Sequence, residues 1–138
     1  MKASELMKFV KEVYMERKED AERKPLVYIS GKMTGVENYN KPKFDRTKAL
    51  LESEGYEVLS PADLVAEESF EWHDYMRVDV ALLAMCDAIY MLDDWRDSRG
   101  AKAELDIARA LKLEIGFQDK LDDSMLRRNG TRRRVMHD

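Results

Sequence analysis

Glu104 is the carboxylate whose neighbours in the sequence most favour a chemical role. The segment that contains it opens with Ser98 and Gly100, which are typical of the start of a helix. At helical spacing, Glu104 shares a face with Ala101 and Ala108 and so points inward. An inward carboxylate is costly unless it is paired or functional. The alternative is a partly exposed glutamate that the helix dipole favours near an N-terminus.

Asp79 is a second carboxylate expected to point inward, because Tyr75, Leu82 and Leu83 surround it on the same helix. Two inward carboxylates on neighbouring helices suit the cleavage of a glycosidic bond, one as nucleophile and the other assisting protonation or orientation. A structural hydrogen bond is the alternative role for Asp79. Tyr28 ends an apolar run, where its hydroxyl can hold a carboxylate or simply belong to the core.

Several residues at predicted strand ends and at the start of this helix are candidate ligand contacts. Ser98 and Gly100 leave backbone N–H groups open to an anion, so they form a plausible seat for a phosphate or hydroxyl, although ordinary capping explains them equally well. Trp95 can stack on a base or pack at the edge of the cleft. The expected substrate-binding residues are Ser30, Gly31, Met33, Trp95, Ser98 and Gly100.

Other chemistries are disfavoured by what the sequence contains. It has neither a G-x-G-x-x-G nor a G-x-x-x-x-G-K-[ST] pattern, which argues against dinucleotide binding and P-loop chemistry. His73 and His137 are its two histidines, so a histidine metal site or a Ser-His-Asp triad is not expected. Cys86 follows an apolar stretch and is interpreted as a buried small side chain rather than a nucleophile. We therefore expect no metal and no cofactor.

Composition indicates a globular protein in a reducing compartment. A length of 138 residues suits one domain, and 44% hydrophobic with 38% charged residues suits a soluble one. A single cysteine, the lack of a signal-peptide pattern and the lack of a long apolar run predict a cytoplasmic protein without a membrane span.

The net charge of −4 is unevenly distributed. Residues 1–24 hold seven Lys and Arg against six Asp and Glu, and residues 127–138 hold five Arg against one Asp, which leaves −9 on residues 25–126. An acidic body is poorly matched to a nucleic-acid polymer. The arginine-rich tail is interpreted mainly as a solvated terminus, with contact to nucleic acid as the alternative.

Apolar runs and helical periodicity alternate along the body of the chain. They predict strands at 26–29, 56–59, 88–92 and 113–117, and helices at 4–20, 44–54, 71–85, 98–112 and 119–128, with Ser69 as a possible N-cap of the third helix. This alternation predicts an α/β fold: a flavodoxin- or Rossmann-like parallel sheet of four to five strands with helices on both faces. The expected organisation is an N-terminal amphipathic helix and linker (1–24), the α/β domain (25–118), and a C-terminal helix with the basic tail (119–138).

Three segments taken together resemble the nucleoside 2-deoxyribosyltransferase superfamily over about residues 26–116. These are Tyr28-Ile29-Ser30-Gly31, Asp79 ahead of Cys86-Asp87-Ala88, and Ser98-x-Gly100-x-x-x-Glu104. The likeness is strongest to a small phage and bacterial branch of DUF4406-like domains, related to 2′-deoxynucleoside 5′-phosphate N-hydrolases. That branch shares a Tyr-Ile-Ser-Gly-x-Met-Thr-Gly opening and a Ser-Arg-Gly-Ala segment.

The resemblance implies a flavodoxin-like sheet and a double displacement at the strand ends. Glu104 would attack C1′ of a 2′-deoxynucleoside or its 5′-monophosphate, Tyr28 would orient Glu104, and Asp79 would help the base to leave. Water or a second base would then release the sugar, giving a hydrolase or a transferase. Serine at position 98 is typical of members that accept 5′-monophosphates. The loop 32–40 and residues 95–97 depart from the family pattern and leave the preferred base open.

Two other functions remain open from the sequence. The same cleft suits a non-catalytic nucleotide-binding sensor or sponge, and the arginine tail suits a nucleic-acid accessory role, which we rank last. A homodimer or larger assembly is implied by the resemblance and by the lone amphipathic helix at the N-terminus, and the expected ligand is a small nucleoside or nucleotide.

Overall fold

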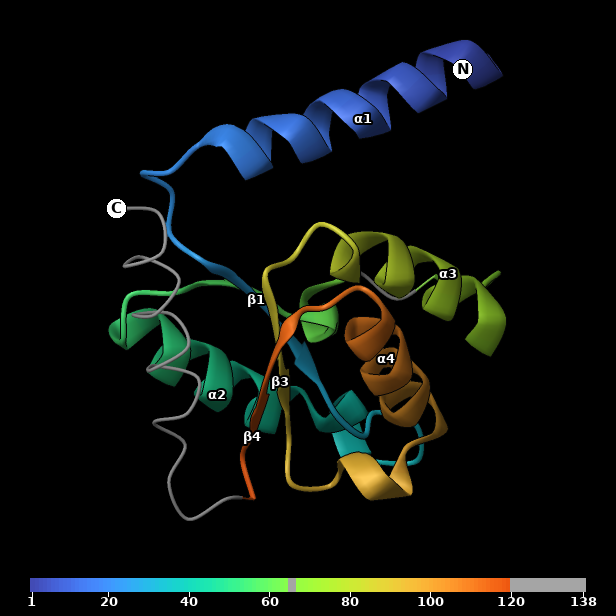
Figure 1. Ribbon diagram of the computed structural model, residues 1–138. Coiled ribbons are helices and arrows are strands. Elements are labelled where there is room, and N and C mark those ends of the chain that lie inside the picture. The colour runs from blue at the N-terminus through green and yellow to red at the C-terminus, as the bar shows by residue number, and fades with distance from the viewer. Residues whose placement is uncertain (65–66, 120–138) are drawn as a thin grey trace.

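The computed structural model describes residues 1–64 and 67–119 (Figure 1). Within them a four-stranded parallel sheet forms, with the strand order β2-β1-β3-β4. The strands are β1 (Leu26–Ser30), β2 (Glu57–Leu59), β3 (Ala88–Met91) and β4 (Glu114–Phe117). The predicted α/β class with a parallel sheet is confirmed.

The two central strands are the most apolar segments of the chain. Every residue of β1 and of β3 is buried, whereas the edge strands β2 and β4 are partly exposed. Strands covered on both faces read as continuous apolar runs, which is why periodicity located β1 and β3 closely. The order of the strands reverses direction between β1 and β3, and ligands of such sheets bind at the carboxyl ends of the strands beside this point.

Helices cover both faces of the sheet (Figure 1). They are α2 (Lys41–Ser53), α3 (Trp72–Leu83) and α4 (Arg99–Ala110). Because side chains alternate along a strand, Val27 and Ile29 face one core cluster with Phe44 of α2. Leu26 and Tyr28 face the other cluster, which α3 and α4 complete.

The helix starts differ in how well the sequence indicated them. Ser98 caps α4 as expected, since its Oγ accepts a hydrogen bond from Ala101 N at 3.0 Å. The expectation that Ser69 caps the third helix is wrong. That helix begins at Trp72 with a reciprocal capping box between Glu71 and Asp74, so two carboxylates bind the open N–H groups.

Helix α1 (Ala3–Glu19) lies apart from the sheet and its covering helices (Figure 1). The predicted helix at 119–128 falls almost entirely outside the described residues, as does the arginine-rich tail. Across residues 1–64 and 67–119, no helix combines the length and the apolar character that crossing a membrane requires.

Candidate active site

Strand β1 delivers two hydroxyl groups to the same side of the sheet. Tyr28 and Ser30 are two residues apart, so their side chains point to the face covered by α3 and α4. Both residues are fully buried. Ser30 is also the last residue of β1, which places it at the carboxyl edge of the sheet.

Helix α4 delivers Glu104 to these hydroxyls. The buried residues Ala101, Glu104, Leu105 and Ala108 form its inward stripe at helical spacing. Tyr28 Oη donates to Glu104 Oε2 at 2.5 Å, and Ser30 Oγ donates to Glu104 Oε1 at 2.7 Å. Each carboxylate oxygen therefore has its own hydroxyl donor, and the plane of the carboxylate is fixed.

The environment of Glu104 works against its ionisation. The pKa of Glu104 is raised to about 7, mainly because the carboxyl is buried; the hydrogen bonds from Tyr28 and Ser30 act in the lowering direction, and the negative charge of Asp79 adds to the rise. Burial and the charge of Glu104 raise the pKa of Tyr28 well above its ordinary value, so that hydroxyl keeps its proton. The group is thus a carboxyl that changes charge near neutral pH between two permanent donors.

Asp79 lies on α3 and is nine-tenths buried. Its Oδ1 atom is buried and has no hydrogen-bond partner among the described residues, and burial raises the pKa of Asp79 to about 6. The charge of Asp79 acts on both Tyr28 and Glu104. A buried carboxyl oxygen without a partner is uncommon and needs an explanation, of which a ligand group is one.

Gly100 and Ser98 lie where α4 begins, against helix α3. A Cβ added to Gly100 would lie 3.2 Å from Met76 Sδ and 3.7 Å from Trp72 Nε1, so the glycine also lets the two helices approach. The guanidinium of Arg99 stacks over the Trp72 ring at 3.8 Å from its centroid.

The remaining predicted binding residues have structural contacts of their own. A Cβ on Gly31 would lie 2.6 Å from Leu92 Cδ1, so the Leu92 side chain already fills the space that a side chain at position 31 would need. Met33 packs against the core cluster on the α2 face, away from Glu104. Trp95 packs against Phe117 with ring centroids 5.8 Å apart, in agreement with the packing alternative.

Asp94 was not singled out in the sequence, yet it joins two of the loops at the carboxyl edge of the sheet. Its Oδ1 accepts from Lys32 N at 2.9 Å, and its Oδ2 accepts from Asn40 Nδ2 at 3.0 Å and from Lys43 Nζ at 3.1 Å. The loop after β1 is thereby tied to the loop after β3. Its place directly after a buried strand was the available signal.

The described residues contain no group of three or more His, Cys, Asp or Glu side chains placed to hold a metal ion. Glu104 and Asp79 can instead exchange protons with a small polar molecule that reaches them, since both carboxyls titrate near neutral pH.

Comparison with known proteins bears on this site. A family model described as a domain of unknown function, DUF4406, matches residues 25–117. The chain belongs to the DUF4406 family. Among solved structures, it is similar to a "2-desoxiribosyltransferase from Leishmania mexicana", with a TM-score of 0.55 and 20% sequence identity. That match covers 67% of this chain and 63% of the other, and at this identity it establishes a shared fold. No curated protein matches the chain.

Proposed function

We propose that this protein cleaves the N-glycosidic bond of 2′-deoxynucleosides or their 5′-monophosphates through a covalent sugar ester on Glu104. The observation that carries the proposal is the buried Glu104 carboxylate with a hydroxyl donor on each oxygen. A nucleophile of this kind must be held in one orientation before the sugar arrives. The fold shared with a deoxyribosyltransferase supports the same chemistry.

The reaction has two displacements at C1′. An oxygen of Glu104 forms a bond to C1′ as the C1′–N bond breaks, and its electron pair leaves with the base. Protonated Asp79 gives its proton to the departing base, or hydrogen-bonds to it through Oδ1. Water, or a second base, then attacks C1′ and frees Glu104, with hydrolysis or transfer as the result.

The raised pKa values bring both carboxyls into the range near neutral pH. Glu104 must be ionised to attack, and Asp79 must be protonated to donate. With pKa values of about 7 and about 6, the pair holds a single proton over part of this range, and that proton lies mainly on Glu104. The productive form, with the proton on Asp79, is therefore the less populated of the two.

The start of α4 favours a 5′-phosphate as the group that orients the substrate. Ser98 Oγ accepts from Ala101 N and carries a proton that it can donate to a phosphate oxygen. Gly100 has no side chain, but Met76 and Trp72 of α3 occupy the space beside it, so Ser98 is the residue that carries this preference. We therefore place 2′-deoxynucleoside 5′-monophosphates ahead of free nucleosides.

The test is a product assay on the full chain. Each common deoxynucleoside and its 5′-monophosphate is incubated with the protein, with and without an acceptor base, and free base and new nucleoside are separated by chromatography. We expect base release by the wild type and a loss of at least about a thousandfold in Glu104→Gln. A wild-type protein inert on all of them, or a variant as active as wild type, contradicts the proposal.

A second candidate is a non-catalytic nucleotide-binding sensor or sponge that uses the same cleft. The observation in its favour is the pKa of Glu104, because a neutral carboxyl below about pH 7 can hydrogen-bond to a sugar but cannot attack it. Retention of a nucleotide without any release of base, across the pH range, distinguishes this function from the first.

A further inference from the structure

Helix α1 presents a broad apolar face that the described residues leave largely uncovered. None of its 17 residues is buried. At about 100° per residue, its large apolar side chains fall mainly on one side. Five of them are between 42% and 73% exposed: Leu6, Met7, Phe9, Val10 and Tyr14. An exposed apolar stripe of this extent marks an interaction surface.

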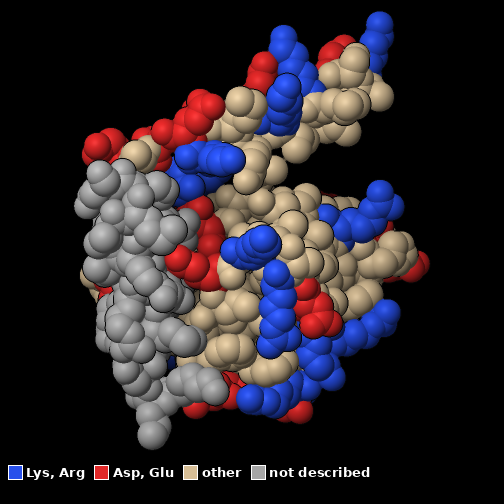
Figure 2. Space-filling view, in the orientation of Figure 1, with Lys and Arg blue, Asp and Glu red and all other residues tan. Residues whose placement is uncertain are grey.

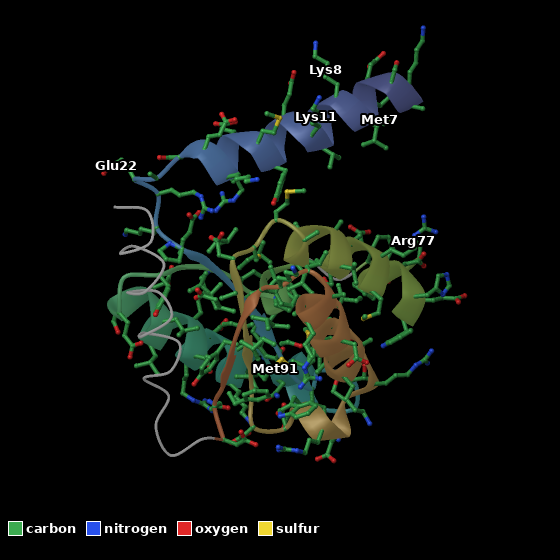
Figure 3. All side chains as sticks on the ribbon, viewed as in Figure 1. Met7, Lys8, Lys11, Glu22, Arg77 and Met91 are labelled. Atoms are coloured by element: carbon green, nitrogen blue, oxygen red, sulfur yellow. The ribbon has the colours of Figure 1, made fainter. Side chains whose placement is uncertain are left out.

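This face borders a groove between α1 and the body. The groove has a volume of about 770 Å³, and Figure 2 shows it as a hollow below α1. In Figure 3, Met7 lies on the side of α1 that faces the body. The groove is lined by Leu6, Met7, Lys8, Val10, Lys11, Tyr14, Ala84 and Met85. Apolar side chains dominate its walls, so the fitting occupant is itself apolar.

The linker after α1 is anchored to the body, which fixes where the helix leaves it. Arg23 forms an ion pair with Asp87, in which Nη2 donates to Oδ1 at 2.7 Å. Leu26 N donates to Asp87 Oδ2 at 2.8 Å, so one carboxylate holds both the linker and the start of β1. Helix α1 is therefore held beside the groove rather than tethered loosely.

The charges on α1 have opposite signs in its two halves. Residues 2–11 contain three lysines against one glutamate, a net charge of +2. Residues 12–20 contain four acidic residues against one lysine and one arginine, a net charge of −2. Two such helices packed antiparallel place each positive half beside a negative half, whereas parallel packing opposes like charges.

We propose that α1 is a self-association element, and that the occupant of the groove is α1 of a second copy of this chain. The two helices pack antiparallel about a two-fold axis, with their apolar faces together and against Ala84 and Met85. The same surface then serves both copies, as a closed dimer requires. Helix α1 itself lies outside residues 25–117, and its pairing does not depend on the glycosidic chemistry.

Sedimentation equilibrium of the full chain tests the dimer. We expect the wild type at twice the 16.1 kDa chain mass and Val10→Asp at the single-chain mass. Met15→Asp is the matched control, because Met15 is also 42% exposed but does not line the groove. It should remain a dimer, and circular dichroism should show equal helix content in both variants. A monomeric wild type, or a dimeric Val10→Asp, overturns the proposal.

Charge reversal tests the antiparallel arrangement. The variant K8E/K11E makes both halves of α1 negative, so alone it should be monomeric. The variant K8E/K11E/E12K/E16K exchanges the signs of the two halves, so in an antiparallel arrangement it should dimerise with itself but not with wild type, whereas parallel packing would favour the mixed dimer. A mixed dimer with wild type, or a K8E/K11E variant that dimerises as well as wild type, overturns antiparallel pairing.

Discussion

At the scale of single residues, Glu104 combines two requirements that oppose each other. In the proposed reaction its burial would hold it in place for attack and exclude water, but the same burial favours the neutral form, which cannot attack. The hydroxyls of Tyr28 and Ser30 partly offset this because they stabilise the ionised carboxylate. The site therefore destabilises the folded chain at every pH at which Glu104 is charged.

This cost should appear as a dependence of stability on pH. The pKa of Glu104 is 4.5 in an unperturbed chain and about 7 in the folded one, so between these values the folded state holds a proton that the unfolded state has lost. The free energy of unfolding then falls as pH rises through this window, by roughly 3 kcal/mol from this group. Glu104→Gln lacks the titration. Urea denaturation should show its stability relative to wild type improving between pH 4.5 and pH 8. An unchanged difference would contradict a buried, titrating Glu104.

The two hydroxyl donors should control the pH at which activity begins. Tyr28→Phe and Ser30→Ala each remove a hydrogen bond that lowers the pKa of Glu104, so its pKa rises and the acidic limb of the kcat/KM profile moves to higher pH. Thr47→Val is the control, since it removes a buried hydroxyl on α2, away from the site. Profiles that keep the wild-type limb in both site variants would argue against the nucleophile role.

At the scale of elements, the close approach of the loop after β1 to β3 depends on one missing side chain. Gly31→Ala would place a Cβ 2.6 Å from Leu92 Cδ1, and overpacking of this kind costs about 1–3 kcal/mol. Leu92→Ala alone should cost about 2–5 kcal/mol by opening a cavity. The double variant should be more stable than the sum of the two costs predicts, because Leu92→Ala removes the Cγ and Cδ1 atoms that the new methyl group would meet and leaves only the contact with Cβ at 2.8 Å.

Urea unfolding of the four chains measures this coupling. Gly35→Ala serves as the control, since a Cβ there meets nothing within 4 Å and its cost comes from a φ of +81°. Its effect should add to that of Leu92→Ala without coupling. If the costs of Gly31→Ala and Leu92→Ala simply add, the contact between residues 31 and 92 does not determine how closely the loop after β1 approaches β3.

The sequence located elements better than it located contacts between them. The buried strands β1 and β3 were predictable because continuous apolar runs are typical of strands covered on both faces. Tyr28 and Glu104 were predicted as partners from the resemblance. Ser30 was expected to touch substrate, whereas it is fully buried on Glu104, a result of how α4 packs on the sheet.

The contacts of Asp94 show that interactions between loops were also not predictable from the sequence. Its partners are 51 to 62 residues away in the sequence. Lys43 lies on α2, and the other two lie in a loop whose path includes consecutive left-handed residues at Asn38, Tyr39 and Asn40. Neither periodicity nor turn chemistry predicts three such residues in a row without glycine. Only the folded arrangement of the two loops brings these donors to one carboxylate.

At the scale of the whole molecule, the charge distribution restricts the kind of anion that the protein can bind. Residues 25–126 carry a net charge of −9, so long-range attraction of a polyanion to the body is unfavourable. A single phosphate requires only a local seat, and the proposed one lies at Ser98, where α4 begins. The charge of the body therefore agrees better with the proposed mononucleotide substrate than with a nucleic-acid chain.

A ligand that binds the folded protein raises its melting temperature. Measuring this temperature in a variant that cannot react therefore detects binding separately from turnover. We expect a saturating 2′-deoxynucleoside 5′-monophosphate to raise the melting temperature of Glu104→Gln, because that variant retains the cleft but cannot form the sugar ester. At a ligand concentration of about 100 Kd, the gain is about 2.7 kcal/mol, or roughly 5–10 °C for a domain of this size.

Ser98→Ala should reduce the shift in melting temperature for the monophosphate but leave the shift for the free nucleoside unchanged. If wild type and Glu104→Gln both show a lasting shift with no base released, the protein is a nucleotide-binding module. If neither shifts with any deoxynucleotide, the cleft does not bind this class of ligand.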